Sequence, residues 1–419
     1  MGSLSCRALL TSAVVAGTLA LASGSAWAVK VGPVEDPVRV VKVPKGQPIV
    51  MALYTVLSGP DAGQGLDPYR GAQLAVDDLK GKLLDRPLRL TAEDDACSAE
   101  GGQTAATKIA ANQQVVIALG SNCSSATIPA APILWKAGIP DIATGAASPK
   151  LTDVKARGPG YEGFSRVIYN AAFEGEALAE WARNTKKLDK VAAVHDGTPY
   201  VQGLVEAFTN KFKSLGGTVV TVEAINAQDV DMRPMLTRLV TTKPQMVFFP
   251  TFIAATAHIV KQAKEVDGFK DIMMMGSDNV LDKNFINLAG QSSVGFTIVS
   301  PPLDADSYGD AYKKLLEQYK KKFGEGPTTA WTAHGYDAVM LAAKSIEKVA
   351  VKDKDGTIYI PISKLQEAIL ATKDMKGVSG TITCRPNGDC AQFRAVFYQY
   401  VNADPNTFDI GKNPKNVNP

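Results

Sequence analysis

A hydroxyl-rich turn is the first candidate for ligand chemistry in this sequence. Residues 120–127 read Gly-Ser-Asn-Cys-Ser-Ser-Ala-Thr and follow the apolar run Val115–Leu119. If a helix starts in this turn, its free N–H groups and its dipole suit a carboxylate, with Asn122 and Ser124 as the nearest side chains. Ser124 could instead be an ordinary helix N-cap, a position that serine often occupies.

An acidic residue after another apolar run offers the opposite charge. Asp278 closely follows Ile272–Met275, where its carboxylate could hold an ammonium or simply cap a helix. Tyr200 and Phe252 follow further apolar runs, and each also has a structural interpretation, as a hydrophobic staple and as a core residue. Taken singly, each of these residues is explained more simply by its structural role, because serine and aspartate are common caps.

The motifs of common enzymes are missing from the sequence. There is no G-x-S-x-G elbow and no GK[ST] phosphate loop, and Gly63-Gln64-Gly65 lacks the third glycine of a dinucleotide fingerprint. The histidines His195, His258 and His334 are most simply one loop residue and two helix residues. We therefore expect no catalytic residues and no cofactor.

The candidate residues sit in an alternation of strand and helix patterns. Amphipathic stretches such as Tyr69–Leu79 and Val201–Leu215 follow most of the apolar runs. This alternation predicts parallel sheets covered by helices on both faces, and such sheets bind ligands at the carboxyl ends of their strands. The apolar runs are Ile49–Val56, Leu88–Thr91, Val115–Leu119, Val191–Val194, Val219–Val222, Met246–Phe249, Ile272–Met275 and Gly295–Val299.

The alternation recurs as two series, separated near Ser165–Tyr169, and predicts an α/β protein with two doubly wound, Rossmann-like lobes. A late hairpin, Gly380–Cys384 with Ala391–Val401, implies that the chain crosses between the lobes more than once. We expect lobe 1 to comprise 47–166 and 300–377, and lobe 2 to comprise 167–299 and 378–404. The stretches 29–46 and 405–419 are expected to be surface extensions.

The N-terminus predicts export. Arg7 precedes the apolar stretch Ala8–Ala22, and Ala26-Trp27-Ala28 matches the A-x-A pattern that signal peptidase cuts after. A membrane anchor is the alternative, but the stretch is shorter than the roughly 20 residues that a span needs. We expect residues 1–28 to be a cleaved signal peptide and the mature chain to be periplasmic.

The composition limits the classes of molecule that the protein is expected to bind. The chain has 419 residues, a formal net charge of +3, and 21% charged residues without a basic stripe. A nucleic-acid partner is therefore not expected. The length suffices for two domains of about 100–200 residues each.

Four of the five cysteines lie outside the predicted signal peptide, in a compartment where disulfides persist. Cys384 and Cys390 flank an Asn-Gly turn and should face each other across a hairpin. Cys97 and Cys123 then pair by elimination. A zinc site is the alternative, but neither pair has the usual ligand spacing, so no metal is expected.

The stretch Ile49–Val401 resembles the branched-chain amino acid (leucine, isoleucine and valine) substrate-binding proteins of ABC transporters. The resemblance implies a type I periplasmic binding fold with three hinge crossings, a ligand in the cleft, delivery to membrane permease subunits, and a disulfide between Cys97 and Cys123. A monomer is expected. The motifs that carry it are Leu57-Ser58-Gly59-Pro60, Asp94-Asp95-Ala96-Cys97, Asn122 to Thr127, Ser148-Pro149-Lys150-Leu151-Thr152, His195-Asp196 with Tyr200 and Gly203, and Gly276-Ser277-Asp278.

The resemblance also assigns roles to residues that hold the ligand backbone. Ser124 matches the serine that holds the α-carboxylate, and Asn122 supplies main-chain atoms beside it. Tyr200 matches a cleft tyrosine of the other lobe. Asp278 matches the acidic partner of the α-ammonium, although the family usually has glutamate there.

Three departures from the family pattern alter the pocket. The threonine that grips the carboxylate is Ala147 here, with Ser148 adjacent as a substitute. Two cleft tyrosines are replaced, by Gln64 and by Phe252. An aromatic or other small carboxylate, or an amide, is therefore the alternative ligand to a branched-chain or related amino acid. A sensor ectodomain and an enzyme are less expected.

Overall fold

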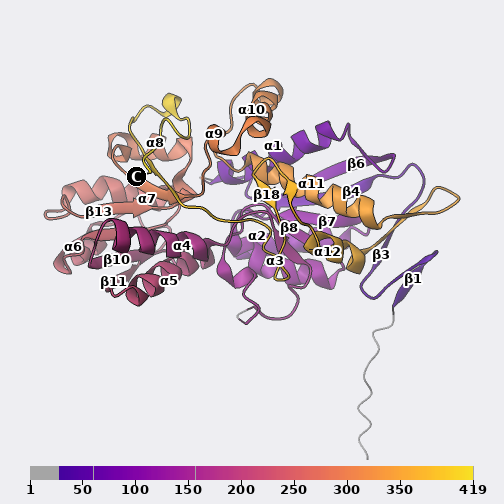
Figure 1. Ribbon diagram of the computed structural model, residues 1–419, viewed down its shortest axis with the longest axis horizontal. Helices are drawn as coiled ribbons and strands as arrows, with labels where there is room; N and C mark the ends of the chain where they lie inside the picture. The colour runs from indigo at the N-terminus through magenta and orange to yellow at the C-terminus, as the bar shows by residue number, and fades with distance from the viewer. Residues whose placement is uncertain (1–27, 60, 156, 419) are drawn as a thin grey trace, which may run out of the picture.

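Lobe 1 is built on a mostly parallel sheet with the strand order β5-β6-β4-β7-β8-β9 (Figure 1). The computed structural model describes residues 28–59, 61–155 and 157–418. All seven residues of β4 are buried, as expected of a central parallel strand that is covered on both faces. The strands are β4 (Ile49–Thr55), β5 (Lys82–Leu83), β6 (Arg86–Asp94), β7 (Val115–Gly120), β8 (Asp141–Ala143) and β9 (Phe164–Arg166).

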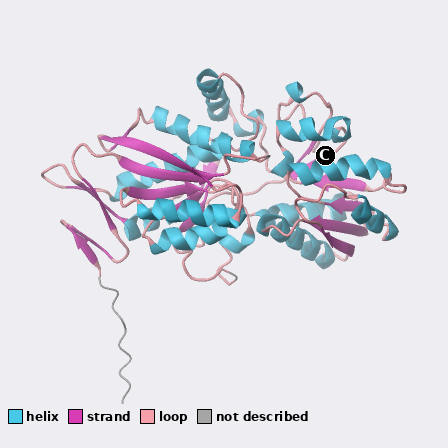
Figure 2. Cartoon of the chain, turned by 180° about the vertical axis from the view of Figure 1, so that it is seen from behind, coloured by secondary structure: helices cyan, strands magenta, loops and turns pink. Residues whose placement is uncertain are grey.

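Helices cover both faces of this sheet (Figure 2). Helices α1 (Ala62–Asp78) and α11 (Thr332–Val349) pack against each other over one face, and α2 (Ala99–Ala111) packs against α3 (Ser124–Lys136) over the other. Lobe 1 also contains α10 (Asp310–Phe323), which packs beside α1. The short helix α9 (Ala305–Tyr308) leads into α10, and α12 (Ile362–Leu370) packs against α11.

Lobe 2 has a sheet with the order β11-β10-β12-β13-β14-β19-β20, of which the last two strands are antiparallel. Its strands are β10 (Lys190–His195), β11 (Thr218–Ala224), β12 (Met246–Phe248), β13 (Met273–Gly276), β14 (Thr297–Ser300), β19 (Val396–Gln399) and β20 (Lys415–Asn416). Its helices are α4 (Ala171–Glu180), α5 (Pro199–Ser214), α6 (Arg233–Thr241), α7 (Ile253–Gln262) and α8 (Lys283–Ala289).

The chain crosses between the two sheets three times: after β9, after β14 and before β19. The number of crossings matches what the family resemblance implies. Among the described residues, none of the helices combines the length and the apolar character that a membrane span requires. The predicted signal peptide lies outside the described residues except for Ala28.

The structure differs from the expected lobe boundary near residue 378. Strand β18 (Thr381–Ile382) pairs with β17 (Met375–Lys376), Asp389 forms a bridge with Arg166 at the end of β9, and Cys390 packs in the core of lobe 1. Residues 378–390 therefore lie with lobe 1, and the expected hairpin between 380–384 and 391–401 does not form. Only β19 continues into lobe 2, where it pairs with β14.

Both terminal stretches are more than surface extensions. Strand β3 (Val40–Val43) pairs antiparallel with β16 (Ile358–Pro361), and Val41 and Val43 pack in the core of lobe 1, because alternate valines of the strand face inward. Strands β1 (Val29–Val31) and β2 (Val34–Asp36) form a small hairpin ahead of it. At the other end, β20 pairs with β19 and extends the sheet of lobe 2.

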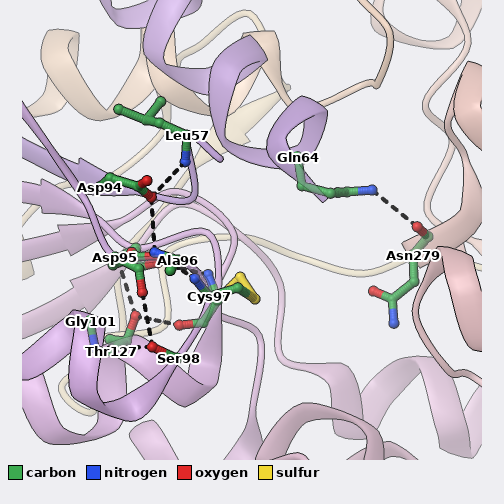
Figure 3. The surroundings of a disulfide bond; sticks show 12 residues. Leu57, Gln64, Asp94, Asp95, Ala96, Cys97, Ser98, Gly101, Thr127 and Asn279 are labelled. Atoms are coloured by element: carbon green, nitrogen blue, oxygen red, sulfur yellow. Dashed lines mark hydrogen bonds between the residues drawn. A yellow bond between two sulfur atoms is a disulfide. The ribbon is translucent and has the colours of Figure 1, made fainter. Parts of the chain in front are cut away.

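Both predicted disulfides form in the structure. Asp94 and Asp95 shape the loop that carries Cys97, because their carboxylates accept the N–H groups of Ala96 and Cys97, each at 2.9 Å (Figure 3). This loop brings Cys97 to Cys123 with the two Cα atoms 5.2 Å apart, and Cys384 is bonded to Cys390 across the tight turn.

Loss of the two disulfides should have different costs. The sequence separations are 26 residues for Cys97–Cys123 and 6 for Cys384–Cys390, so removing the first as a double serine variant should lower the free energy of unfolding by about 3 kcal/mol and the second by about 2 kcal/mol. Urea unfolding of both variants and the wild type measures these losses. Equal losses would contradict the loop-length explanation, and free thiols in the unreduced wild-type protein would contradict the pairing itself.

Candidate ligand site

A cavity lies between the two lobes. Seven of the eight predicted ligand residues line it, and they come from both lobes as expected: Gln64, Asn122, Ser124, Ala147, Tyr200, Phe252 and Asp278. The sequence analysis missed four further lining side chains, which are Ile168, Tyr169, Asn279 and Trp331. Cys123 and Gly145 complete the wall.

The wall in lobe 1 is the start of α3. The interpretation of Ser124 as an N-cap is wrong, because Cys123 occupies the cap position and makes no side-chain cap bond, so the first N–H groups of the helix keep their capacity to bind an anion. The Ser124 hydroxyl accepts the N–H of Ser148 at 3.0 Å and can still donate its own proton. Asn122 adds a buried Oδ1 atom that has no hydrogen-bond partner within the described chain.

Ser148 does not line the cavity. Its hydroxyl donates instead to the carbonyl of Pro199, 3.1 Å away at the start of α5 in lobe 2. The expectation that Ser148 replaces the hydroxyl missing at Ala147 is therefore not met, because the contact across the closed cleft occupies this side chain.

The wall in lobe 2 is acidic. Asp278 lies two residues after the end of β13 and is 2% exposed, and its carboxylate contacts the hydroxyls of Tyr169 and Tyr200, the latter at 3.2 Å from Oδ1. The interpretation of Asp278 as a helix cap is wrong, since Ser277 holds the cap position and the short helix has no side-chain cap bond. Burial raises the pKa of Asp278 to about 7, although the two phenols oppose this shift.

A second carboxylate lies behind the first and was also missed. Glu174 on α4 is completely buried, and its Oε2 atom lies 3.0 Å from the hydroxyl of Tyr169 and 3.4 Å from that of Tyr200. Burial and the neighbouring charge of Asp278 raise the pKa of Glu174 well above its usual range.

Direct contacts hold the lobes closed over the cavity. Gln64 accepts the indole N–H of Trp331 at 2.5 Å and donates to the carbonyl of Asn279 at 3.0 Å across the cleft (Figure 3). A main-chain bond from Lys283 N to Thr328 O, 3.2 Å long, joins the lobes nearby. Gln64, predicted as a pocket residue from the family pattern, thus also links the two lobes.

Arg166 holds in place the loop that contains Ala147, a residue of the cavity wall. Its buried guanidinium donates to the carbonyls of Ala146 at 3.1 Å and of Ser148 at 2.9 Å, and pairs with Asp389 at 2.6 Å. The loop that contains Ala147 is therefore anchored to the turn closed by the second disulfide. Among the described residues, no group of three or more His, Cys, Asp or Glu side chains is arranged to hold a metal.

Two doubly wound lobes that close over a cavity, with a helix start that lacks a side-chain cap on one side and a buried carboxylate on the other, have the architecture of a solute-binding protein. The sequence profile of periplasmic binding proteins matches residues 48–407. The chain belongs to the periplasmic binding protein family, and the resemblance seen in the sequence is confirmed.

Relatives in sequence include the Leu/Ile/Val-binding protein of Escherichia coli, which is 29% identical over 289 residues, covering 68% of this chain and 76% of the relative. The leucine-, isoleucine-, valine-, threonine- and alanine-binding protein of Pseudomonas aeruginosa is 26% identical over 354 residues, covering 84% and 90%.

Solved structures share the fold. A leucine binding protein from Thermotoga maritima superposes with a TM-score of 0.73 at 24% identity, covering 85% of this chain and 96% of that one. A solute binding protein from R. palustris in complex with benzoate has a TM-score of 0.71 at 19% identity, covering 88% and 95%.

Proposed function

We propose that this protein is the periplasmic solute-binding component of an ABC importer, and that it captures an α-amino acid in the cleft and delivers it to permease subunits as a monomer. Asp278 carries the proposal. Its carboxylate is buried in the cavity wall, forms no ion pair with a described cationic side chain, and belongs to the lobe opposite the start of α3. A ligand with an ammonium and a carboxylate would satisfy both sides at once.

The names of the sequence relatives support an amino acid, in most cases one with an apolar side chain, although the Pseudomonas aeruginosa relative is also named for threonine. Phe252 and Trp331 give part of the cavity wall an aromatic surface that suits an apolar group of the ligand. An aromatic carboxylate is the second candidate, because structural relatives were solved with benzoate and with 3,4-dihydroxybenzoic acid. Asp278 opposes it, since a buried carboxylate would then face an anion without a cation.

A thermal-shift screen of the mature protein against amino acids, amides and aromatic acids tests the proposal. A ligand that binds only the folded state raises the melting temperature by mass action. We expect the largest shifts with amino acids. Shifts with aromatic acids alone would reject the amino acid and favour the second candidate.

Binding should compact the molecule. The contacts across the cleft, such as Gln64 with Asn279 and Ser148 with Pro199, can form only when the lobes are closed, and a ligand that touches both lobes favours this state. Small-angle scattering should show a smaller radius of gyration with ligand, and circular dichroism should show unchanged helix content. A radius that stays the same with a saturating ligand would argue against closure, and a solute that fails in the screen is the control.

Affinity should weaken in acid. The ammonium pairs with ionised Asp278, whose pKa is about 7 without ligand, while the ammonium itself stays charged across this range. Below the pKa, binding must release a proton, so the dissociation constant should rise about tenfold per pH unit. Calorimetric titration between about pH 5 and pH 8 measures this slope. A flat profile would mean that Asp278 does not pair with the ligand.

A further inference from the structure

The two phenols and two carboxylates at the cleft form a closed ring of four contacts. Tyr169 and Tyr200 each contact both Glu174 and Asp278. A phenol carries one proton, and an ionised carboxylate carries none. If both acids were ionised, two protons would have to serve four oxygen–oxygen contacts, and two contacts would set lone pair against lone pair in a buried site.

Among the described residues, no positively charged side chain pairs with these carboxylates in place of the missing protons. Neither Glu174 nor Asp278 forms an ion pair with a described lysine, arginine or histidine. Burial and, to a smaller extent, the charge of Asp278 raise the pKa of Tyr308, which is another phenol and supplies no positive charge. Arg166 interacts electrostatically with Tyr169 but is itself neutralised by Asp389. The missing proton must therefore sit on one of the two carboxyl groups.

The contacts indicate which group holds it. Asp278 uses both oxygens, one for each phenol, whereas Glu174 makes both of its contacts through Oε2. The Oε1 atom of Glu174 is buried and has no hydrogen-bond partner of good geometry in the described chain, and burial raises the pKa of this carboxyl group by more than the main-chain N–H of Asp278 lowers it. Leaving a neutral carbonyl oxygen unpaired costs less than leaving a charged oxygen unpaired, so the proton is more stable on Glu174.

We propose that Glu174 is a positioning residue that keeps its proton at neutral pH and donates it to Tyr169, so that the hydroxyl protons of Tyr169 and Tyr200 both point at Asp278. Three of the four contacts are then hydrogen bonds, and the unused one is the 3.4 Å contact between Tyr200 and Glu174. The cleft presents one negative charge instead of two. The inference about the ligand rests on the proposed function: a single negative charge in the cleft selects a ligand with one ammonium beside Asp278 and disfavours a dication.

Infrared spectroscopy of the ligand-free protein tests the protonation. At about pH 8, Asp278 is mostly ionised, so the carbonyl band of a neutral carboxylic acid should be weaker in Glu174→Gln than in wild type. Other buried acids, such as Asp141, cancel in the difference spectra. An unchanged band in Glu174→Gln would overturn the proposal. Carbon-13 labelling of glutamate in the wild type shifts the same band, so the assignment does not depend on the variant folding.

Titration with an amino acid that succeeds in the screen tests the consequence. Glu174→Gln should keep the dissociation constant within about threefold at pH 8, because a neutral amide replaces a neutral acid of the same shape. A loss of about tenfold or more would show that a Glu174 charge holds the ligand and would overturn the proposal. If the infrared result holds but no amino acid binds, the proposed function fails while the protonation of Glu174 stands.

Discussion

Replacing Asp278 by alanine should weaken ligand binding by about two to four decades. Closing the lobes removes the ligand ammonium from water, and without Asp278 it is left buried beside two phenols and the neutral Glu174. Breaking a buried ion pair costs about 3–5 kcal/mol, and ~1.4 kcal/mol corresponds to one decade in affinity. Asp278→Asn keeps the shape and removes the charge, so it should lose much of the same energy. Calorimetric titration of both variants with the best ligand measures the loss.

Asp282 offers a matched control for this experiment. It is as buried as Asp278 and lies four residues later, but it caps α8 through the N–H of Asn284 and does not line the cavity. Asparagine is an equally good cap, so Asp282→Asn should leave the dissociation constant unchanged. If Asp278→Asn behaves like this control, Asp278 does not bind the ligand, and the main reason to prefer an amino acid is lost.

Removing the carboxylate of Asp389 should destabilise the protein by about 3–5 kcal/mol, because Arg166 is then left charged in the interior. Both partners are almost fully buried, with side-chain exposures of 0% for Arg166 and 4% for Asp389. We expect Asp389→Ala to lower the urea midpoint strongly. The ligand should also bind more weakly, because Arg166 holds the carbonyls of Ala146 and Ser148 beside the cavity.

The exposed pair Lys364–Glu367 is the control for the buried one. Its side chains are 61% and 62% exposed, so Glu367→Gln should change stability by less than about 1 kcal/mol. A loss in Asp389→Ala no larger than in Glu367→Gln would mean that water reaches Arg166 and replaces the missing partner. Weaker binding without lower stability would place the effect of Asp389 on the cavity loop alone.

The parts of the fold that could be predicted are the parts with a local cause. Val115–Leu119 was expected as a strand and is β7, because a continuous apolar run is what a strand covered on both faces requires. The turn around Ser124 and Asp278 could also be predicted as site positions, because each follows a parallel strand of its own lobe and ligands bind at the carboxyl ends of such strands. The predicted helix Tyr69–Leu79 begins earlier, at Ala62. Its first two turns were not predicted because Gly63, Gly65 and Pro68 have low helix propensity.

The parts that were missed depend on contacts between distant segments. Glu174 was not singled out from the sequence, because only the packing of α4 beside α5 and the cleft buries it against Tyr169. Ser148 was assigned to the ligand, but its partner Pro199 reaches it only across the closed cleft. Residues 378–390 were assigned to lobe 2, since nothing in the local sequence shows that Asp389 reaches Arg166.

The pairing of α1 with α11 and of β3 with β16 has a consequence for how the chain folds. Both contacts join the beginning of lobe 1 to residues near the end of the chain, whereas β10 to β14 and α4 to α8 of lobe 2 come from one continuous stretch. Contacts between distant residues form slowly, because the long intervening loop must be closed first. The lobe that comes second in the sequence can therefore complete most of its core first. The apolar face of α1 stays uncovered until α11 packs against it. Between the folding of lobe 2 and this packing, the chain is most exposed to aggregation.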